Sequence, residues 1–245
     1  VIENNSVDRA VIDYYETLKE QKNITVVTYE GEFHYARINN FGARYATGKY
    51  LLLLNNDTQV ISMNWLEAML MYAQRPDVGA VGAKLYYGDR TIQHAGVVIG
   101  LGAHRTAGHT HYRINYDNLG YMGKLCYAQN VSAVTGACLM VRKSIYDALG
   151  GLDEQFAVAL NDVDFCLRIR EKGYLNVFTP FAELYHYESA SRGSDTADRK
   201  KAERYEAESA LFRERWKELL AKGDPYYNPN FSLDHSDYSL RTEFD

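Results

Sequence analysis

The stretch LLLLNNDTQV, residues 51–60, contains the strongest structural signal in the chain. Its four leucines run directly into Asn55, Asn56 and Asp57. A short apolar run bounded by Gly48 and by polar residues predicts a strand that is buried on both faces, in the centre of a sheet. The carboxyl end of such a strand is where open α/β sheets bind ligands. The same three polar residues also suit an ordinary turn, so this stretch alone leaves both interpretations open.

Strand and helix signals alternate outward from this point, which predicts an α/β domain. Residues 101–130 show weak periodicity and predict a long loop. The expected strands cover residues 23–30, 78–87, 91–100, 131–143 (broken by Gly136), 175–180 and 182–187, and the expected helices cover residues 35–48, 63–76, 161–174 and 197–223.

Composition excludes several classes of protein. The 245 residues carry a net charge of -5, without the basic patch of a nucleic-acid binder. No apolar stretch approaches about 18 residues, so no transmembrane segment is predicted. The three cysteines form no CxxC pair, which favours a reducing compartment. We therefore expect a cytoplasmic protein, with peripheral association at the inner face of the membrane left open.

Three segments, in order, resemble the family 2 glycosyltransferases, and most of all their bacterial rhamnosyltransferase-like members. They are residues 39–60, residues 136–174, and ELYHYESASRG at residues 183–193. The resemblance covers residues 1–193 and implies the GT-A fold, an α/β architecture with a Rossmann-like mixed central sheet flanked by helices. Residues 194–245 would add a C-terminal helix and tail packed on that domain. Residues 1–8 would be the second strand and its turn, with the first strand upstream.

The resemblance also implies a nucleotide-sugar donor site with a divalent cation. Asp57 matches the final acid of the family's DxD motif and His186 matches a histidine that completes the site, so both would hold Mn²⁺ or Mg²⁺. Asn55 replaces the first acid of the motif and would bind a ribose hydroxyl. The donor-binding residues implied are Glu3, Arg37, Asn40, Asn55 and Asn56.

Two of these residues have structural alternatives. Asn40 falls on a small-residue face of its helix, where a buried amide often satisfies backbone groups. A lone histidine in a short strand, such as His186, is often structural as well.

Asn161 and Asp162 match the family's Glu-Asp pair, which implies that Asp162 is the catalytic base. Gly136, Ala137 and Asn161 would lie near the acceptor. Sugar transfer requires charge stabilisation on the departing diphosphate and removal of a proton from the attacking hydroxyl, which a metal and a carboxylate supply. A single base suits direct displacement with inversion, whereas glycosidases use two carboxylates. Asp162 also suits a helix cap, and Asp164 has no assigned role.

These features predict a metal-dependent inverting glycosyltransferase that takes a UDP-, dTDP- or GDP-sugar. The acceptor would be a glycan or a lipid-linked glycan, in cell wall or surface polysaccharide biosynthesis. Two alternatives remain. A sugar-phosphate nucleotidyltransferase has a related architecture, and a non-catalytic nucleotide- or sugar-binding module would account for the two asparagines that replace acids.

Two further patterns are interpreted as structural. His94, His104, His109 and His111 lack accompanying cysteines or acids at ligand spacing, so a mobile acceptor-side loop is expected rather than a zinc site. FRERW, residues 212–216, half resembles the QxxRW motif of processive polysaccharide synthases. Because Phe212 replaces the glutamine, a packed amphipathic helix with a tryptophan anchor is predicted instead.

Overall fold

A computed structural model describes residues 1–187 and 199–242. Its centre is a mixed seven-stranded sheet in the order β3-β10-β5-β11-β4, with β6 beside β5 and β9 beside β11. The strands are β3 (Tyr50–Leu54), β4 (Thr58–Val60), β5 (Val78–Tyr86), β6 (Ile92–His94), β9 (Gln129–Val131), β10 (Cys138–Arg142) and β11 (Leu175–His186). The mixed sheet agrees with the predicted fold class.

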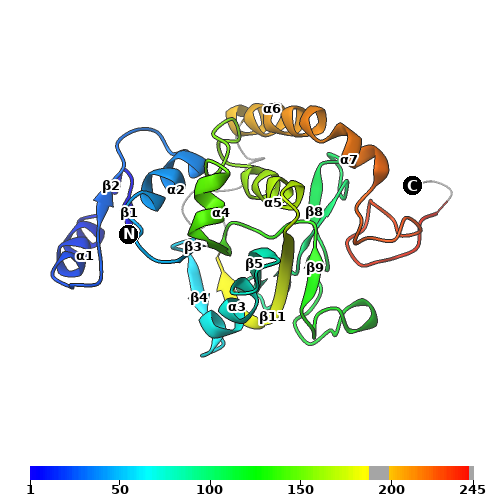
Figure 1. Ribbon diagram of the computed structural model, residues 1–245, viewed down its shortest axis with the longest axis horizontal. Helices are drawn as coiled ribbons and strands as arrows, with labels where there is room; N and C mark the ends of the chain where they lie inside the picture. Colours follow the sequence, from blue (N-terminus) through cyan, green and yellow to red (C-terminus); the bar gives the residue numbers. More distant parts are fainter. Residues whose placement is uncertain (188–198, 243–245) are drawn as a thin grey trace.

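Helices cover both faces of this sheet (Figure 1). Helix α3 (Trp65–Ala73) packs on one face, and α4 (Lys143–Ala148) and α5 (Asn161–Glu171) pack on the other. Helix α6 (Arg199–Arg215) lies across the outside of α5 and leads into α7 (Lys217–Lys222). Among the described residues, no helix combines the length and apolar character that crossing a membrane requires.

The leucine run is less buried than predicted: Leu51 and Leu53 are buried on one face, whereas on the other Leu52 is partly buried and Leu54 is 43% exposed. Leu51 and Leu53 belong to the core beneath α4 and α5, whereas Leu52 packs against the core beneath α3. Its predicted central position is wrong, because β3 is an edge strand of the seven-stranded sheet and its residues pair with β10. Burial on both faces reports the layers above and below a strand, and it does not report the strand's neighbours within the sheet.

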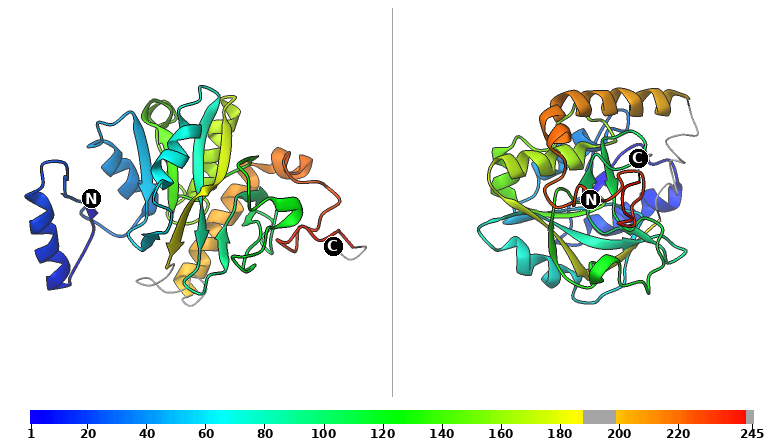
Figure 2. Two further views of the ribbon diagram at one scale, coloured as in Figure 1. Left: turned by 90° about the horizontal axis from the view of Figure 1, so that it is seen from below. Right: turned by 90° about the vertical axis from the view of Figure 1, so that its right-hand side faces the viewer.

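The N-terminal segment forms a separate two-stranded parallel sheet. Strand β1 (Ile2–Glu3) pairs with β2 (Val27–Thr28), and α1 (Arg9–Lys19) connects them. These elements lie at the opposite end of the molecule from the C-terminus (Figure 2). The strand predicted over residues 23–30 is therefore too long, because it pairs only as far as its two-residue partner extends.

Several other predicted boundaries also need correction. Strand β11 is continuous over 12 residues, because a register shift between Thr179 and Glu183 accommodates the proline between them. The strand predicted over residues 131–143 begins only at Cys138. Helix α2 (Tyr35–Ala43) ends before Gly48, and the helix predicted over residues 197–223 is interrupted at Trp216, between α6 and α7.

The region predicted as a single strand and a long loop is more ordered than expected. Gly96, with a φ of 100°, separates β6 from β7 (Val97–Ile99). Strand β7 pairs with β8 (Ala107–His109), and a 3₁₀ turn (Tyr121–Gly123) precedes β9. The predicted domain boundary after residue 193, and the part of ELYHYESASRG beyond Tyr187, lie outside the described residues.

Candidate active site

A cavity of about 410 Å³ opens where β3, β11 and the first turn of α5 meet. Seven of the residues singled out from the sequence line it: Asn55, Asp57, Gly136, Ala137, Asn161, Asp162 and His186. These residues come from four segments that are up to 131 positions apart in the chain. The fold therefore gathers the predicted metal pair, the predicted base and the predicted acceptor residues around one cavity.

Asp57 and His186 meet because of strand pairing. The chain turns from β3 into β4, whose Thr58 lies opposite His186 in the antiparallel pair with β11. Asp57 Oδ1 consequently lies 3.1 Å from His186 Nε2. The amide nitrogen of Asn55 is 3.2 Å from the same imidazole nitrogen. One carboxylate, one imidazole and one amide therefore converge at the sheet edge.

Gln93 fixes the orientation of the His186 ring. His186 Nδ1 lies 2.7 Å from Gln93 Oε1, and the amide nitrogen of Gln93 donates to the carbonyl of His186 at 3.4 Å. Because a carbonyl oxygen only accepts, Nδ1 donates to Gln93, and Nε2 is the ring nitrogen that faces Asp57. A carboxylate and an imidazole whose other nitrogen donates to a carbonyl form a donor set that fits a divalent cation such as Mn²⁺.

Asp162 lies in the first turn of α5 and borders the cavity. Its Oδ2 accepts the backbone N–H of Gly136 at 2.7 Å, and its Oδ1 accepts the N–H of Val163 at 2.8 Å. The N-cap of α5 is Leu160, in the left-handed region with a φ of 61°. Asp162 is thus not the N-cap residue: Oδ1 binds an N–H of the first helical turn, and Oδ2 is fixed on a group outside the helix. A positioned carboxylate beside a cavity is suited to proton transfer.

Gly136 is held between Asp162 and Tyr35. The Tyr35 hydroxyl donates to the carbonyl of Gly136 at 2.7 Å. A Cβ atom at this glycine would lie 2.8 Å from that hydroxyl oxygen, closer than real side chains approach. The backbone at this point can therefore reach both partners only without a side chain. Asn161, which is almost fully buried, donates to the carbonyl of Val158 and closes the turn before the helix.

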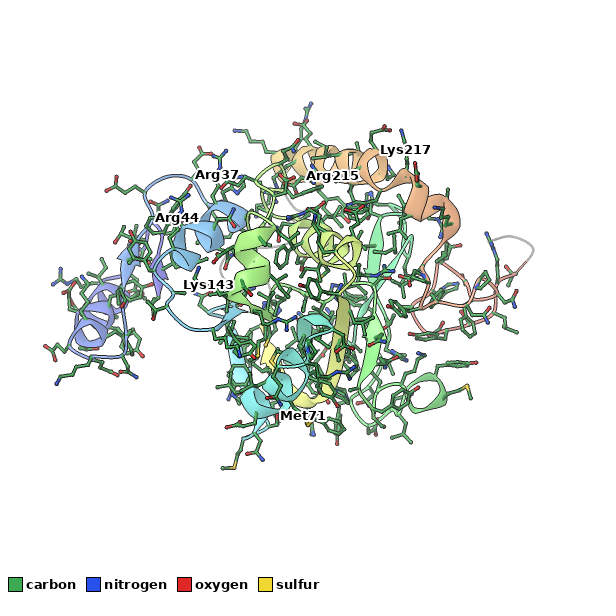
Figure 3. All side chains as sticks on the ribbon, in the orientation of Figure 1. Arg37, Arg44, Met71, Lys143, Arg215 and Lys217 are labelled. Atoms are coloured by element: carbon green, nitrogen blue, oxygen red, sulfur yellow. The ribbon has the colours of Figure 1, made fainter. Side chains whose placement is uncertain are left out.

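Four predicted donor-binding residues are not in the cavity lining: Glu3, Arg37, Asn40 and Asn56. Asn40 accepts from the Tyr146 hydroxyl and from the Leu152 N–H, which is the structural alternative described above. Arg37, labelled in Figure 3, pairs with Glu154 at 3.1 Å. Glu3 accepts the N–H of Ser6, and Asn56 is exposed in the turn after β3.

Asp164, which had no assigned role, is buried and binds the C-terminal end of α6. Its carboxylate accepts from Arg168 at 2.8 Å, from Arg215 at 2.9 Å and from the Trp216 indole at 3.1 Å. The predicted packed helix with a tryptophan anchor is confirmed at residues 212–216, since Phe212 and Trp216 are both buried.

The histidines form no single cluster. His94 and His109 are in contact through their Nδ1 atoms at 2.8 Å, and His109 borders the cavity. Burial, together with His109 and His186 nearby, lowers the pKa of His94 well below its ordinary value. His111 is buried against Tyr238, and His104 pairs with Glu206 on α6.

Comparisons with known proteins agree with this architecture. The family model described as Glycosyl transferase family 2 matches residues 1–150. The chain belongs to this family. It is 44% identical over 98% of its length to the uncharacterized protein y4gI of Sinorhizobium fredii, and 40% identical over 88% of its length to the O-antigen biosynthesis protein RfbC of Myxococcus xanthus. It spans only 26% and 16% of those two proteins.

A shorter match of 39% identity covers 27% of the chain and 22% of an N-acetylglucosaminyl-diphospho-decaprenol L-rhamnosyltransferase of Mycobacterium tuberculosis. Two solved structures confirm the GT-A fold. GalNAc-T7 with UDP, GalNAc and Mn²⁺ matches with a TM-score of 0.65 and 13% identity, over 90% of this chain and 42% of that one. The mannosyltransferase PcManGT of Pyrobaculum calidifontis, with GDP-Man and Mn²⁺, matches with a TM-score of 0.58 and 16% identity, over 90% and 58%.

Proposed function

We propose that this family 2 domain transfers a sugar from a nucleotide-sugar donor to a hydroxyl acceptor, with inversion at the anomeric carbon. Asp57 and His186 hold a divalent cation, and Asp162 is the general base. The observation that supports this most is that one cavity is bordered by both the Asp57–His186 pair and the Asp162 carboxylate. Charge stabilisation and proton removal are thus available to the same reacting group.

The donor diphosphate binds at the β3–β4 turn in this proposal. When bound there, the cation stabilises negative charge on the departing diphosphate. Asp57 and His186 would hold this cation, because Gln93 binds Nδ1 of His186 and keeps Nε2 directed toward Asp57. A hard cation held there would offset the charge of the donor phosphates. Asn55 contributes an amide in place of a carboxylate and contacts the donor ribose.

Asp162 accepts the proton of the attacking hydroxyl. Asp57 and Asp162 are the two carboxylates among the described residues that border the cavity. Because Asp57 faces His186, one carboxylate remains for the acceptor side, which favours a single displacement. The Gly136 N–H holds Oδ2 of Asp162, and Gly136 and Ala137 form the adjacent backbone wall for the acceptor sugar.

The names of the relatives support a role in surface polysaccharide synthesis. They describe O-antigen biosynthesis and rhamnosyl transfer to a lipid-linked sugar, and the two solved structures contain UDP and GDP-Man, each with Mn²⁺. We infer a UDP-, dTDP- or GDP-sugar donor and a glycan or lipid-linked acceptor. Such an acceptor fits a cytoplasmic enzyme that works at the inner face of the membrane.

Calorimetry tests this proposal first. UDP, GDP and dTDP are titrated into the protein with and without Mn²⁺, and into the variants Asp57→Asn and Asp77→Asn. Asp77 precedes β5, at the opposite end of that strand from the cavity, and pairs with Arg75 at the surface, so it is a matched control. We expect Mn²⁺-dependent binding of one nucleotide, retained in Asp77→Asn and lost in Asp57→Asn.

Turnover then separates the alternatives. The corresponding sugar nucleotide should release its nucleoside diphosphate when an acceptor glycan is added. Nucleotide binding without release from any donor would contradict the proposal and favour a binding module. Release of pyrophosphate from a nucleoside triphosphate and a sugar phosphate would instead identify a nucleotidyltransferase.

A further inference from the structure

Helix α6 holds the loop that leads into the proposed base at two places and binds α5 just beyond it. This loop, called here the 153–160 loop, joins α4 to α5. Arg215 binds Asp153 at its start at 2.7 Å and Asp164, just beyond its end, at 2.9 Å. Glu208 binds its middle, at Ala157, Val158 and Ala159. Arg215, labelled in Figure 3, extends from α6 toward α5.

Glu208 is unusual because its carboxylate is buried although the rest of its helix, α6, is highly charged. It is 4% exposed. Oε1 accepts the N–H groups of Ala157 at 2.8 Å and Val158 at 3.2 Å, and Oε2 accepts that of Ala159 at 2.8 Å. A buried charge is costly unless hydrogen bonds satisfy it, and three converging N–H donors satisfy this one. The carboxylate in turn fixes three successive peptide units.

The same face of α6 continues this contact. Glu208, Phe212 and Trp216 recur at four-residue spacing and are all buried, so they share one side of the helix. Phe212 packs on Phe156 of the loop, with ring centroids 6.4 Å apart. Tyr205, one turn before Glu208, borders the cavity itself. This face of α6 therefore extends from Tyr205 at the cavity wall to Trp216, which binds Asp164 of α5.

The three fixed peptide units lie immediately before the residues that set the direction of Asp162. Leu160 follows Ala159 in the left-handed region, with a φ of 61°, and begins α5. On the other side of the loop, the carbonyl of Ala157 accepts the N–H of Tyr35 at 2.7 Å. A non-glycine residue keeps such a conformation only when its surroundings enforce it. Glu208 and Tyr35 together provide that enforcement.

We propose that Glu208 is a positioning residue for Asp162, an inference that rests on the proposed function. By binding residues 157–159, its carboxylate keeps Leu160 in its left-handed conformation and the Asp162 carboxylate on the Gly136 N–H. Glu208 itself does not touch the reacting atoms. Asp57 lies in the turn between β3 and β4 and His186 lies on β11, so the 153–160 loop does not carry the proposed metal pair.

Glu208→Gln is the variant that tests this most directly. Glutamine has the same shape, but its NH₂ group meets an N–H donor where the carboxylate oxygen accepted one. The loop then relaxes, and a small displacement of a catalytic group lowers kcat strongly. Glu206→Gln is the matched control, because Glu206 lies on the same helix and is exposed, pairing with Arg213. Glu208→Asp, which keeps the charge on a shorter stem, is a second variant that retains an acidic partner for the loop.

Steady-state kinetics and amide hydrogen exchange are measured on wild type and all three variants, well below each melting temperature. In Glu208→Gln we expect kcat to fall by about tenfold or more, with KM for the donor changed by less than about threefold. Exchange at residues 157–159 should accelerate, and Glu208→Asp should show the same effects more weakly. Glu206→Gln should match wild type.

A merely structural role would lower the melting temperature and leave kcat of the folded enzyme unchanged. Wild-type kcat in both Glu208 variants, or unchanged exchange at residues 157–159, would therefore overturn the inference. Absence of turnover in wild type with every donor would overturn the proposed function instead, so the two failures can be distinguished.

Discussion

His186 is held between Gln93 and Asp57: its Nδ1 lies 2.7 Å from Gln93 Oε1, and its Nε2 lies 3.1 Å from Asp57 Oδ1. The glutamine keeps a hydrogen on Nδ1, so Nε2 is the ring nitrogen that can serve a cation. A residue outside the proposed metal ligands therefore controls the chemistry of one of them.

Gln93→Met tests this dependence on the buried amide. Methionine fills a similar volume but cannot accept from Nδ1, so the imidazole loses its fixed tautomer. We expect the affinity for Mn²⁺, measured by calorimetry in the presence of the bound nucleotide, to fall by about 10- to 100-fold. Gln74→Met, an exposed change at the end of α3, should leave it unchanged. Equal affinities in the two variants would contradict a supporting role for Gln93.

Asp162→Asn should separate binding from chemistry. The amide keeps the size of the side chain but cannot take a proton, so transfer should slow by about 10²- to 10⁴-fold. Metal-dependent nucleotide binding should persist, because Asp57, in the β3–β4 turn, and His186, on β11, lie outside α5. Turnover and nucleotide calorimetry on the same samples check both, with Asp77→Asn as control. Near-normal turnover would exclude Asp162 as the base.

Asp164→Asn should lower the stability of the protein. This carboxylate is fully buried and binds Arg168, Arg215 and Trp216. Neutralising it leaves the largely buried Arg168 without its carboxylate partner and Arg215 with Asp153 alone, so the free energy of unfolding should fall by about 3 kcal/mol. Urea denaturation measures this. Asp147→Asn, which removes a surface pair with Lys143, should cost less than about 1 kcal/mol. Equal costs would show that the Asp164 network contributes little.

Gly136→Ala should destabilise the cavity wall through contact with Tyr35. The added Cβ would lie 2.8 Å from the Tyr35 hydroxyl but 3.3 Å from the nearest ring carbons. We expect the substitution to cost about 1–3 kcal/mol in unfolding free energy. In a Tyr35→Phe background, which removes the hydroxyl, the same substitution should cost less. Thermal or urea unfolding of the four proteins in a double-mutant cycle gives the coupling, and strict additivity would argue against this contact.

His111 should make stability depend on pH below neutrality. Burial lowers the pKa of His111 to about 4, and the positive charges of Lys124 and Lys84 add to this effect. The Asp237 carboxylate acts in the opposite direction but is the smallest of these influences. The unfolded chain binds a proton near pH 6.5 and the folded chain does not, so stability is full above pH 6.5 and is lost as pH falls toward 4. At pH 5 this loss is about 2 kcal/mol relative to pH 7.

The control for that prediction replaces one histidine at a time. His111→Asn removes the titrating group and tolerates the positive φ of 56° at this position. Urea unfolding at pH 7 and pH 5 should show a smaller stability difference in His111→Asn than in wild type. His235→Asn, at an exposed position, should retain the wild-type difference. A wild-type difference in His111→Asn would assign the pH dependence to other groups.

The sequence predicted the elements whose signals are local. The leucine strand, the amphipathic helices and the acidic start of α5 each follow from periodicity and composition within about 15 residues. The gathering of Asp57, Asp162 and His186 at one cavity followed from the family resemblance, because no local pattern relates positions so far apart.

Other features depend on pairing between distant segments. The edge position of β3, the two-residue length of β2 and the continuity of β11 are set by which strand lies alongside, and periodicity does not record that. Glu208 is the clearest omission. The sequence of α6 is highly charged. Only the four-residue spacing of Glu208 from Phe212, and of Phe212 from Trp216, indicates that Glu208 lies on the buried face.

The contact between α6 and the 153–160 loop has a consequence for protein engineering. The matched family region ends at residue 150, so Asp162 and the helix that supports it both lie beyond it. A chimera that exchanges the segment around the proposed base would be cut on either side of Asp162. A graft of residues 153–164 alone would separate the peptide groups of 157–159 from the carboxylate that binds them. The transferable unit is therefore residues 153–216, which keeps the loop, the helix it enters and the helix behind it together.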